Sequence, residues 1–123
     1  MPPQDRDIIR MRHMVDAATK AVSFVTGKSR DYLDEDEKLS LALVRLVEII
    51  GEAASKVTAE TQNRHPEIPW SDIIATRNRL IHAYEAVNLD ILWAIVSADL
   101  PPLITQLQRA IEQETKGNQG QLF

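Results

Sequence analysis

The sequence predicts an all-α fold, namely one up-and-down bundle of four to five helices. Apolar residues recur at spacings of three and four over long stretches, and no alternating strand pattern is present. The 123 residues, 44% of them hydrophobic, suit a single domain with its own core. Because a helix pair buries only one face of each helix, the long apolar stripes also favour a dimer.

The first predicted helix covers about 20 residues after the polar N-terminus, and Gly27 is expected to end it. Its apolar stripe comprises Ile8, Met11, Val15, Ala18, Val22 and Val25. Asp31, Asp34, Glu35, Asp36 and Glu37 follow within seven residues. Acidic residues favour the positive end of a helix, so this run predicts a solvated helix start; a partner-docking patch is the alternative.

The second helix is predicted from about Asp36 to about Val57. Its stripe comprises Leu39, Ala42, Leu46, Ile49, Ala53 and Val57. Gly51 lies in the middle, where glycine costs about 1 kcal/mol relative to alanine, so we expect a close approach of another helix there. Arg45, Glu48 and Glu52 are interpreted as solvated or paired charges.

A short helical turn is predicted over residues 58–64, and Pro66 and Pro69 then set an extended connector. The third long helix is predicted to begin at Trp70 and to run to about Ala83. Asn88 is the expected N-cap of a fourth helix through Val96.

The segment Asp99–Pro102 is expected to interrupt that helix, with a proline in the first turn of a last helix. The apolar face of this last helix comprises Leu103, Leu107, Ala110 and Ile111. Residues 1–115 are therefore predicted to form one domain, and the polar residues 116–123 are expected to be a disordered tail.

The bulk composition restricts the class of function. A net charge of −4 and a pI of about 5.3 argue against a nucleic-acid coat protein, although not against an enzyme that contacts a few phosphates. The sequence has no cysteine, which excludes disulfides and thiol catalysis. No signal peptide or membrane span is visible, and the cytoplasm is the expected location.

Five polar or aromatic residues are concentrated within eight positions of the third predicted helix, namely Arg77, Asn78, Arg79, His82 and Tyr84. At about 100° per residue, Asn78 and His82 would share a face, as would Arg77 and Tyr84 if the helix continues that far. Arg77 and His82 would be about 140° apart, which favours a composite site across a dimer. Spacing and composition alone also fit a hydrated helix face with His82 near the helix end.

These side chains suit RNA cleavage without a metal. A histidine with a pKa near neutrality can take the proton of the ribose 2′-hydroxyl as that oxygen attacks the adjacent phosphorus. An arginine can bind the phosphoryl oxygens, and a neighbouring asparagine can orient the imidazole or the phosphate. His13 and His65 have no neighbour at ligand spacing, so a histidine metal site is not expected, and no cofactor is predicted.

The string Arg77-Asn78-x-x-x-His82-x-Tyr84 resembles the signature of HepT-like toxins in the HEPN superfamily. Further matching blocks are residues 45–53, Pro69-Trp70 and residues 92–101, so that the resemblance covers most of residues 5–112. Ala75-Thr76 and Ala83 depart from the family, which often has Gly-Met before the Arg-Asn and Gly after the His.

The resemblance implies a homodimeric, metal-independent endoribonuclease toxin, in which Arg77 binds phosphate, Asn78 polarises the site and His82 is the general base or acid. It also implies an MntA-like nucleotidyltransferase antitoxin that adds AMP to Tyr84. Bulk and negative charge beside Arg77 would then compete with RNA.

Two other functions remain open. One is a non-catalytic helical dimer that binds nucleotide, RNA or a nucleotidyltransferase partner, and the other is a scaffold whose only role is dimerisation. Assembly into a higher oligomer than a dimer also stays open.

Overall fold

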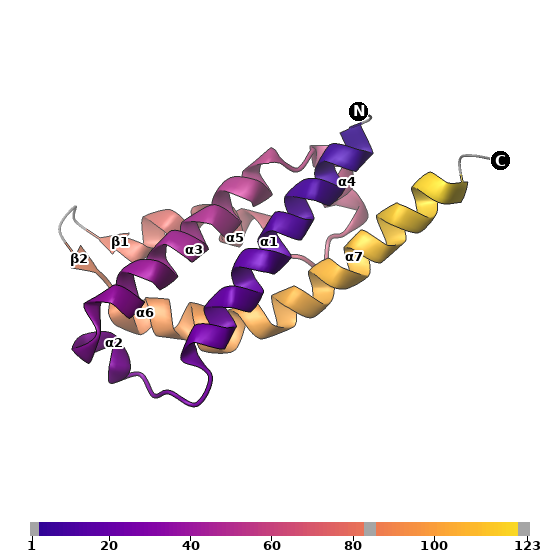
Figure 1. Ribbon diagram of the computed structural model, residues 1–123. Helices are drawn as coiled ribbons and strands as arrows, with labels where there is room; N and C mark the ends of the chain where they lie inside the picture. Colours follow the sequence, from indigo (N-terminus) through magenta and orange to yellow (C-terminus); the bar gives the residue numbers. More distant parts are fainter. Residues whose placement is uncertain (1–2, 83–85, 121–123) are drawn as a thin grey trace.

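A computed structural model describes residues 3–82 and 86–120, and describes the side chains of residues 5–76, 78–80 and 87–117. The chain forms a helical bundle, which confirms the predicted fold class (Figure 1). The elements are α1 (Pro3–Val25), α2 (Tyr32–Glu35), α3 (Glu37–Lys56), α4 (Ala59–Arg64), α5 (Trp70–Leu80), β1 (Ile81–His82), β2 (Ala86–Val87), α6 (Leu89–Ala94), the π-helical segment η1 (Ile95–Asp99) and α7 (Leu100–Gly120).

Helix α1 packs against α3 and α7, and α3 also packs against α5. The core lies between these helices and takes in much of each predicted stripe, although Val15, Val22 and Ile49 are only partly buried. Its fully enclosed members include Met11, Ala18, Leu43, Leu92 and Leu107. Both described ends of the chain lie with α4 at one end of the bundle, whereas β1 and β2 lie at the opposite end (Figure 1).

Local chemistry fixes several helix ends close to where the sequence places them. Gly27 follows α1 with a φ of 77°, a left-handed conformation that glycine adopts at little cost. The side chain of Asp36 caps α3 by accepting a hydrogen bond from the Leu39 N–H. Thr58 caps α4 in the same way, and Asn88 caps α6.

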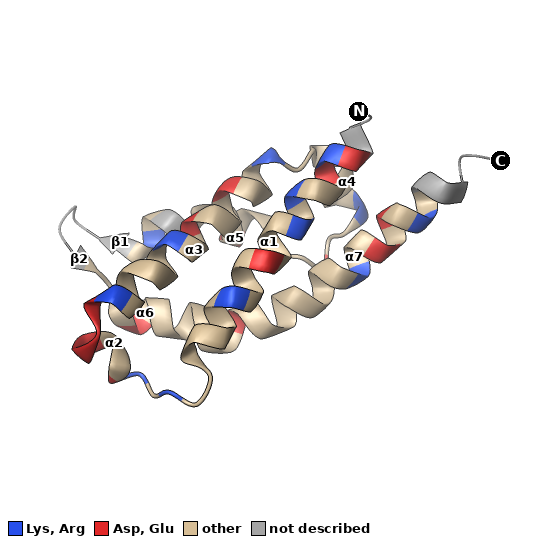
Figure 2. Cartoon of the chain, viewed as in Figure 1, with Lys and Arg blue, Asp and Glu red and all other residues tan. Residues whose placement is uncertain are grey.

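The acidic run between α1 and α3 forms the start of helices, as the first of its two interpretations predicts (Figure 2). Asp36 is the α3 cap, and the Asp34 carboxylate accepts a 2.9 Å hydrogen bond from Arg30. Arg30 also donates to Asp90 at 2.7 Å and thereby ties the α1–α2 connector to α6.

Glycine 51 permits the close approach of α3 and α5 that the sequence predicts. A Cβ atom at this position would lie 3.3 Å from the carbonyl oxygen of Ile73. That separation is tighter than an ordinary van der Waals contact, so the absence of a side chain lets α5 lie directly on α3. The position of α5 matters because this helix carries two of the predicted site residues.

The prolines after Asp99 lie in the first turn of the last helix, as predicted, but they do not break the chain out of helical conformation. The α-helix is interrupted only by the π-helical segment before them. The Leu100 N–H instead donates to the Ile95 carbonyl, five residues back, and η1 joins α6 to α7. Pro101 and Pro102 have no N–H to donate to the carbonyls four residues earlier, and they lie in the first turn of α7. The π turn accommodates that loss, so α6, η1 and α7 form one helical run.

Helix α7 also extends beyond residue 115, where a disordered tail was expected. It includes residues 116–120, and Lys116 forms an ion pair with Glu112 at 2.9 Å. An ion pair between residues four apart stabilises a helix by a few tenths of a kcal/mol. Polar composition therefore did not prevent helix formation here.

A buried polar network fastens α1, α4 and α7 at the end of the bundle that carries the termini. Asp7 is 1% exposed and accepts hydrogen bonds from the hydroxyls of Thr58 and Thr61. Arg64 donates to Thr61 at 3.0 Å and to both carboxylate oxygens of Glu114, at 2.6 and 3.0 Å. The network thus links residues that are about fifty positions apart in the sequence.

Candidate functional site

Helix α5 carries the first half of the predicted site. Its inner face is fixed by the buried residues Trp70, Ile73 and Leu80, and the Trp70 indole N–H donates to the carbonyl of His65 at 3.0 Å. Arg77 and Asn78 lie in the last turns of this helix. Asn78 is exposed, so its amide is free to meet a ligand from solvent.

His82 lies on β1 and not on a helix, which corrects the predicted end of α5 at about Ala83. Helix α5 ends at Leu80, and His82 pairs with Ala86 across a two-residue antiparallel ladder. Beyond Leu80 the backbone N–H and C=O groups no longer find partners within a helix. The β1–β2 ladder and a hydrogen bond from the Asn88 N–H to the Leu80 carbonyl supply partners instead.

The comparison of Asn78 and His82 by helical angle is therefore wrong, and so is the 140° separation of Arg77 and His82. Both assume a helix that continues past Leu80. The structure places the backbone of Arg77 and Asn78 in the last turn of α5 and the backbone of His82 in the strand that follows directly. Tyr84 lies outside the described residues, as do the side chains of Arg77 and His82.

The three charged residues of α3 that we interpreted as solvated or paired fulfil that expectation. Arg45 is 60% exposed and lies 3.6 Å from Glu48 and 3.6 Å from Glu52. Exposed pairs of this kind contribute at most about 1 kcal/mol. These residues form a hydrated surface of α3.

The described part of the chain contains no group of three or more His, Asp or Glu residues placed to hold a metal ion. It also contains no helix that is long and apolar enough to cross a membrane.

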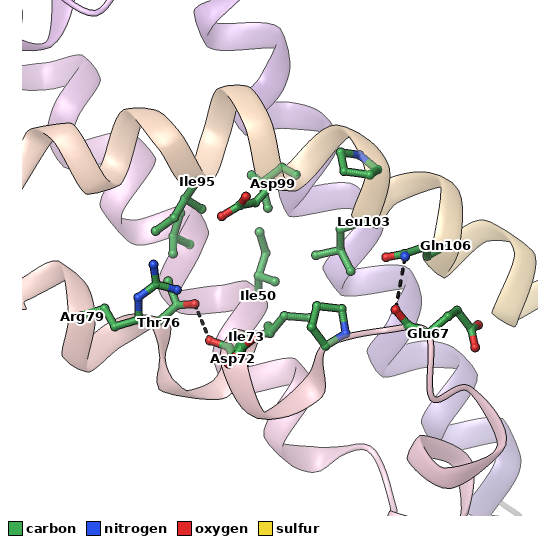
Figure 3. Close-up of a pocket in the computed structure, with 14 residues that line it drawn as sticks. Ile50, Glu67, Asp72, Ile73, Thr76, Arg79, Ile95, Asp99, Leu103 and Gln106 are labelled. Atoms are coloured by element: carbon green, nitrogen blue, oxygen red, sulfur yellow. Dashed lines mark hydrogen bonds between the residues drawn. The ribbon is translucent and has the colours of Figure 1, made fainter.

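A cavity of about 330 Å³ lies between α3, α5, η1 and α7 (Figure 3). Its floor is apolar and includes Ile50, Ile73, Ile95 and Leu103. Polar side chains also line it, namely Glu67, Asp72, Thr76, Arg79, Asp99 and Gln106. Of these, Thr76 is buried, whereas the others reach the solvent-facing rim. Sequence reasoning missed this site because its residues come from four elements and share no motif.

The network around His65 also escaped prediction from the sequence. His65 is 2% exposed and its Nε2 lies 2.7 Å from a carboxylate oxygen of Glu114. The pKa of Glu114 lies below its ordinary value. Hydrogen bonds from Arg64 are the largest cause of this shift, and they outweigh the opposing effect of burial. An ionised Glu114 only accepts hydrogen bonds, so His65 carries its proton on Nε2. This cluster lies at the far end of the bundle from β1.

Comparison with known proteins identifies the relatives of this arrangement. Residues 14–110 match the family model described as "Ribonuclease HepT-like". The chain belongs to the HepT-like ribonuclease family. The match spans α1 to α7 and includes Arg77, Asn78, His82 and Tyr84.

Curated relatives agree with this family assignment. A protein of Thermococcus cleftensis named "Probable ribonuclease HepT" is 36% identical over 97 residues, which cover 79% of this chain and 83% of the relative. A "Putative RNase" of Caldanaerobacter subterraneus subsp. tengcongensis is 32% identical over 104 residues, which cover 85% of this chain and 93% of the relative. A search of solved structures gave no significant match.

Proposed function

We propose that this chain is a metal-independent endoribonuclease toxin with Arg77, Asn78 and His82 as its catalytic residues. The observation that carries the proposal is the occurrence of the complete Arg-Asn-x-x-x-His-x-Tyr string in a member of the HepT-like ribonuclease family. The fold supports it, because α5 is anchored in the core and the chain after it is tied back by Asn88.

The proposed reaction is an attack of the ribose on its own phosphate. His82 takes the proton of the 2′-hydroxyl, the O2′–P bond forms, and the P–O5′ bond breaks. The leaving O5′ then receives a proton from the imidazolium of His82, which returns that residue to its starting state. The products are a 2′,3′-cyclic phosphate and a 5′-hydroxyl, and no water or metal enters the step.

Arg77 and Asn78 have different parts in this step. The guanidinium of Arg77 binds the phosphoryl oxygens and offsets the negative charge that grows on them. Asn78 is exposed one residue along α5, where its amide can donate to the phosphate or orient the imidazole. DNA lacks the 2′-hydroxyl and would not be cut.

The active form is proposed to be a homodimer. Helices α3 and α5 each leave an apolar side chain exposed to solvent, Leu41 with 59% and Ile74 with 40% of its surface. A second copy of the chain could cover such residues, and it could also contribute Arg77 or His82 to a shared site. Self-association does not change which residues perform the chemistry.

The regulation that we propose is the addition of AMP to Tyr84 by an MntA-like nucleotidyltransferase. The phenolic oxygen would attack the α-phosphorus of ATP, and pyrophosphate would leave. The new phosphodiester would place a negative charge near Arg77 and compete with the RNA phosphate. The modified toxin would then be inactive without any change of fold.

Mixing two inactive variants tests the residues and the dimer together. Arg77→Ala and His82→Ala are each expected to lose RNA cleavage. If each site takes Arg77 from one copy and His82 from the other, the mixed dimer contains one intact site and regains part of the activity. Recovery in the mixture establishes a composite site, and loss in both variants without recovery places each site within one chain.

Full activity of either single variant would refute the assignment of that residue. Binding of RNA through Arg77 without any cleavage by the unsubstituted chain would instead favour the non-catalytic binding module. The acidic character of the chain, with a net charge of −4, makes that alternative worth testing.

A further inference from the structure

The cavity between α3, α5, η1 and α7 combines an apolar interior with two opposite charges at its rim. Arg79 enters from α5 and Asp99 from η1. Figure 3 shows Arg79 at one end of the cavity, and Gln106 with Glu67 at the other. The volume of about 330 Å³ lies at the small end of the range for ligand pockets, which suits one compact ring system.

Both charged groups are available to a ligand. Arg79 and Asp99 are exposed, and among the described residues neither takes part in an ion pair, although they line the same cavity. Thr76 donates its hydroxyl proton to the Asp72 carbonyl at 2.7 Å, so that its oxygen can still accept a hydrogen bond. The polar rim therefore offers a forked donor and a carboxylate acceptor above an apolar floor.

The surrounding charge favours a neutral ligand over an anionic one. Among the residues that the structure describes, Glu67, Asp72 and Asp99 line the cavity, and Arg79 is the one basic residue beside them. A phosphate placed here would meet a net negative surface. A flat, uncharged ring with its own donors and acceptors would instead pack on the isoleucines of the floor and reach the rim.

Guanine matches the two charged groups at once. Its N1–H and exocyclic amino group are adjacent donors, which a carboxylate can accept as a pair. Its O6 and N7 are adjacent acceptors, which an arginine fork recognises. Adenine, cytosine and uracil each lack the pair of adjacent donors. We propose that this cavity binds a guanine base of the RNA substrate, through Asp99 and Arg79.

This inference rests on the proposed ribonuclease function, and the geometry of α5 limits which nucleotide is bound. Positions 77 and 79 lie about 160° apart around the helix axis, so that the cavity opens away from the predicted reaction centre. The base in the cavity therefore belongs to a nucleotide some positions removed from the cut. Single-stranded RNA, whose bases can be splayed out of the stack, meets this requirement.

Nucleoside binding tests the cavity separately from cleavage. Guanosine, adenosine, cytidine and uridine are titrated by calorimetry into the full chain and into His82→Ala, and none of them carries a phosphate for Arg77. Guanosine is expected to bind both proteins at least about tenfold more tightly than the other three. Inosine, which lacks the exocyclic amino group, and 7-deazaguanosine, which lacks N7, are each expected to bind several-fold more weakly.

Two variants then assign the contacts. Asp99→Asn and Arg79→Gln are each expected to weaken guanosine binding by about tenfold or more. The matched control changes Asp16→Asn and Arg109→Gln lie at exposed positions outside the cavity, and they are expected to leave guanosine binding unchanged. Both targets are exposed, so the fold should survive, which thermal unfolding checks. Equal binding of the four nucleosides, no binding, or full affinity in Asp99→Asn overturns the inference.

Cleavage mapping decides whether the guanine belongs to RNA. Cuts by the unsubstituted chain are expected at a fixed offset from a guanine, and Asp99→Asn is expected to lose that preference. A guanosine site with no effect on cut positions would overturn the assignment to the RNA substrate. Guanosine binding without any RNA cleavage would leave the cavity site standing and refute the proposed function, because the binding measurement does not depend on catalysis.

Discussion

The backbone N–H of Asn88 donates a 3.0 Å hydrogen bond to the carbonyl of Leu80. Leu80 is the last residue of α5 and is fully buried, and Asn88 is the cap of α6. The hydrogen bond therefore closes the segment that carries His82 and attaches both of its ends to the helical core. We expect the precision of the proposed site to depend on this closure.

Loss of the Asn88 side chain is expected to destabilise α6. Its Oδ1 accepts a 3.1 Å hydrogen bond from the Ile91 N–H, and replacement of such a cap by alanine costs about 1 kcal/mol. Asn88→Ala should therefore lower the free energy of unfolding by about 1 kcal/mol in a urea titration. Asn88→Asp keeps the acceptor and should remain close to the unsubstituted chain. Equal losses in the two variants would contradict the capping role.

Replacement of Glu114 by glutamine is expected to weaken the network that ties α7 to α4. Glutamine keeps the shape but loses the charge that Arg64 contacts at 2.6 Å, and hydrogen bonds to charged groups contribute about 1.5–3 kcal/mol. We expect a loss of about 2 kcal/mol at neutral pH. Glu112→Gln is the control, because Glu112 pairs with Lys116 on the surface of the same helix.

Glu114 is also expected to account for part of the loss of folding stability in acid. The pKa of Glu114 is lowered in the folded protein, chiefly by hydrogen bonds from Arg64. A lowered pKa means that this carboxylate stabilises the fold above its unfolded pKa, about 4.3, and that the contribution is lost as the pH falls through the folded value. Unfolding free energies between pH 6 and about pH 3 should fall less steeply for Glu114→Gln. An unchanged slope would contradict the prediction.

Two glycines in helices should respond in opposite ways to a side chain. Gly51→Leu adds atoms where even a Cβ would lie 3.3 Å from the Ile73 carbonyl oxygen, and overpacking costs about 1–3 kcal/mol. Gly117→Ala has open space around its Cβ and should stabilise α7 by up to about 1 kcal/mol. A tolerated leucine at position 51 would show that α5 can shift away from α3.

Modification of Tyr84 should silence the enzyme through charge and bulk. Co-expression with an MntA-like nucleotidyltransferase is expected to increase the mass of the chain by one adenylyl group and to abolish RNA cleavage. Tyr84→Phe should keep its cleavage and resist both changes. Adenylylation of Tyr84→Phe, detected by intact-mass spectrometry, would place the modification on another residue.

Much of the bundle could be predicted from the sequence because its signals are local. The apolar stripes of α1 and α3, the helix stop at Gly27 and the Asn88 cap are signals that act within a few residues. The structure confirms the stop, the cap and most of the stripe positions. Gly51 could be interpreted as well, since a glycine within an apolar helix costs stability unless a neighbour comes close.

The errors arose where tertiary contacts decide the backbone. The pattern from Trp70 to Ala83 has no helix breaker, yet the pairing of β1 with β2 ends α5 at Leu80. The prolines at 101 and 102 indicate a break, yet the π turn before them keeps the chain helical. The Arg64–Glu114 pair and the cavity with Arg79 and Asp99 join distant segments, so no spacing could indicate them.

The central claim is that His82 drives RNA cleavage through the 2′-hydroxyl and without a metal. The most direct measurement uses a short RNA in excess EDTA, with a matched RNA that carries one 2′-deoxyribose at the mapped cut. We predict cleavage that leaves a 2′,3′-cyclic phosphate, no cut at the deoxy position, and no activity in His82→Ala. Cleavage of the deoxy substrate, a requirement for added metal, or full activity of His82→Ala would contradict the account.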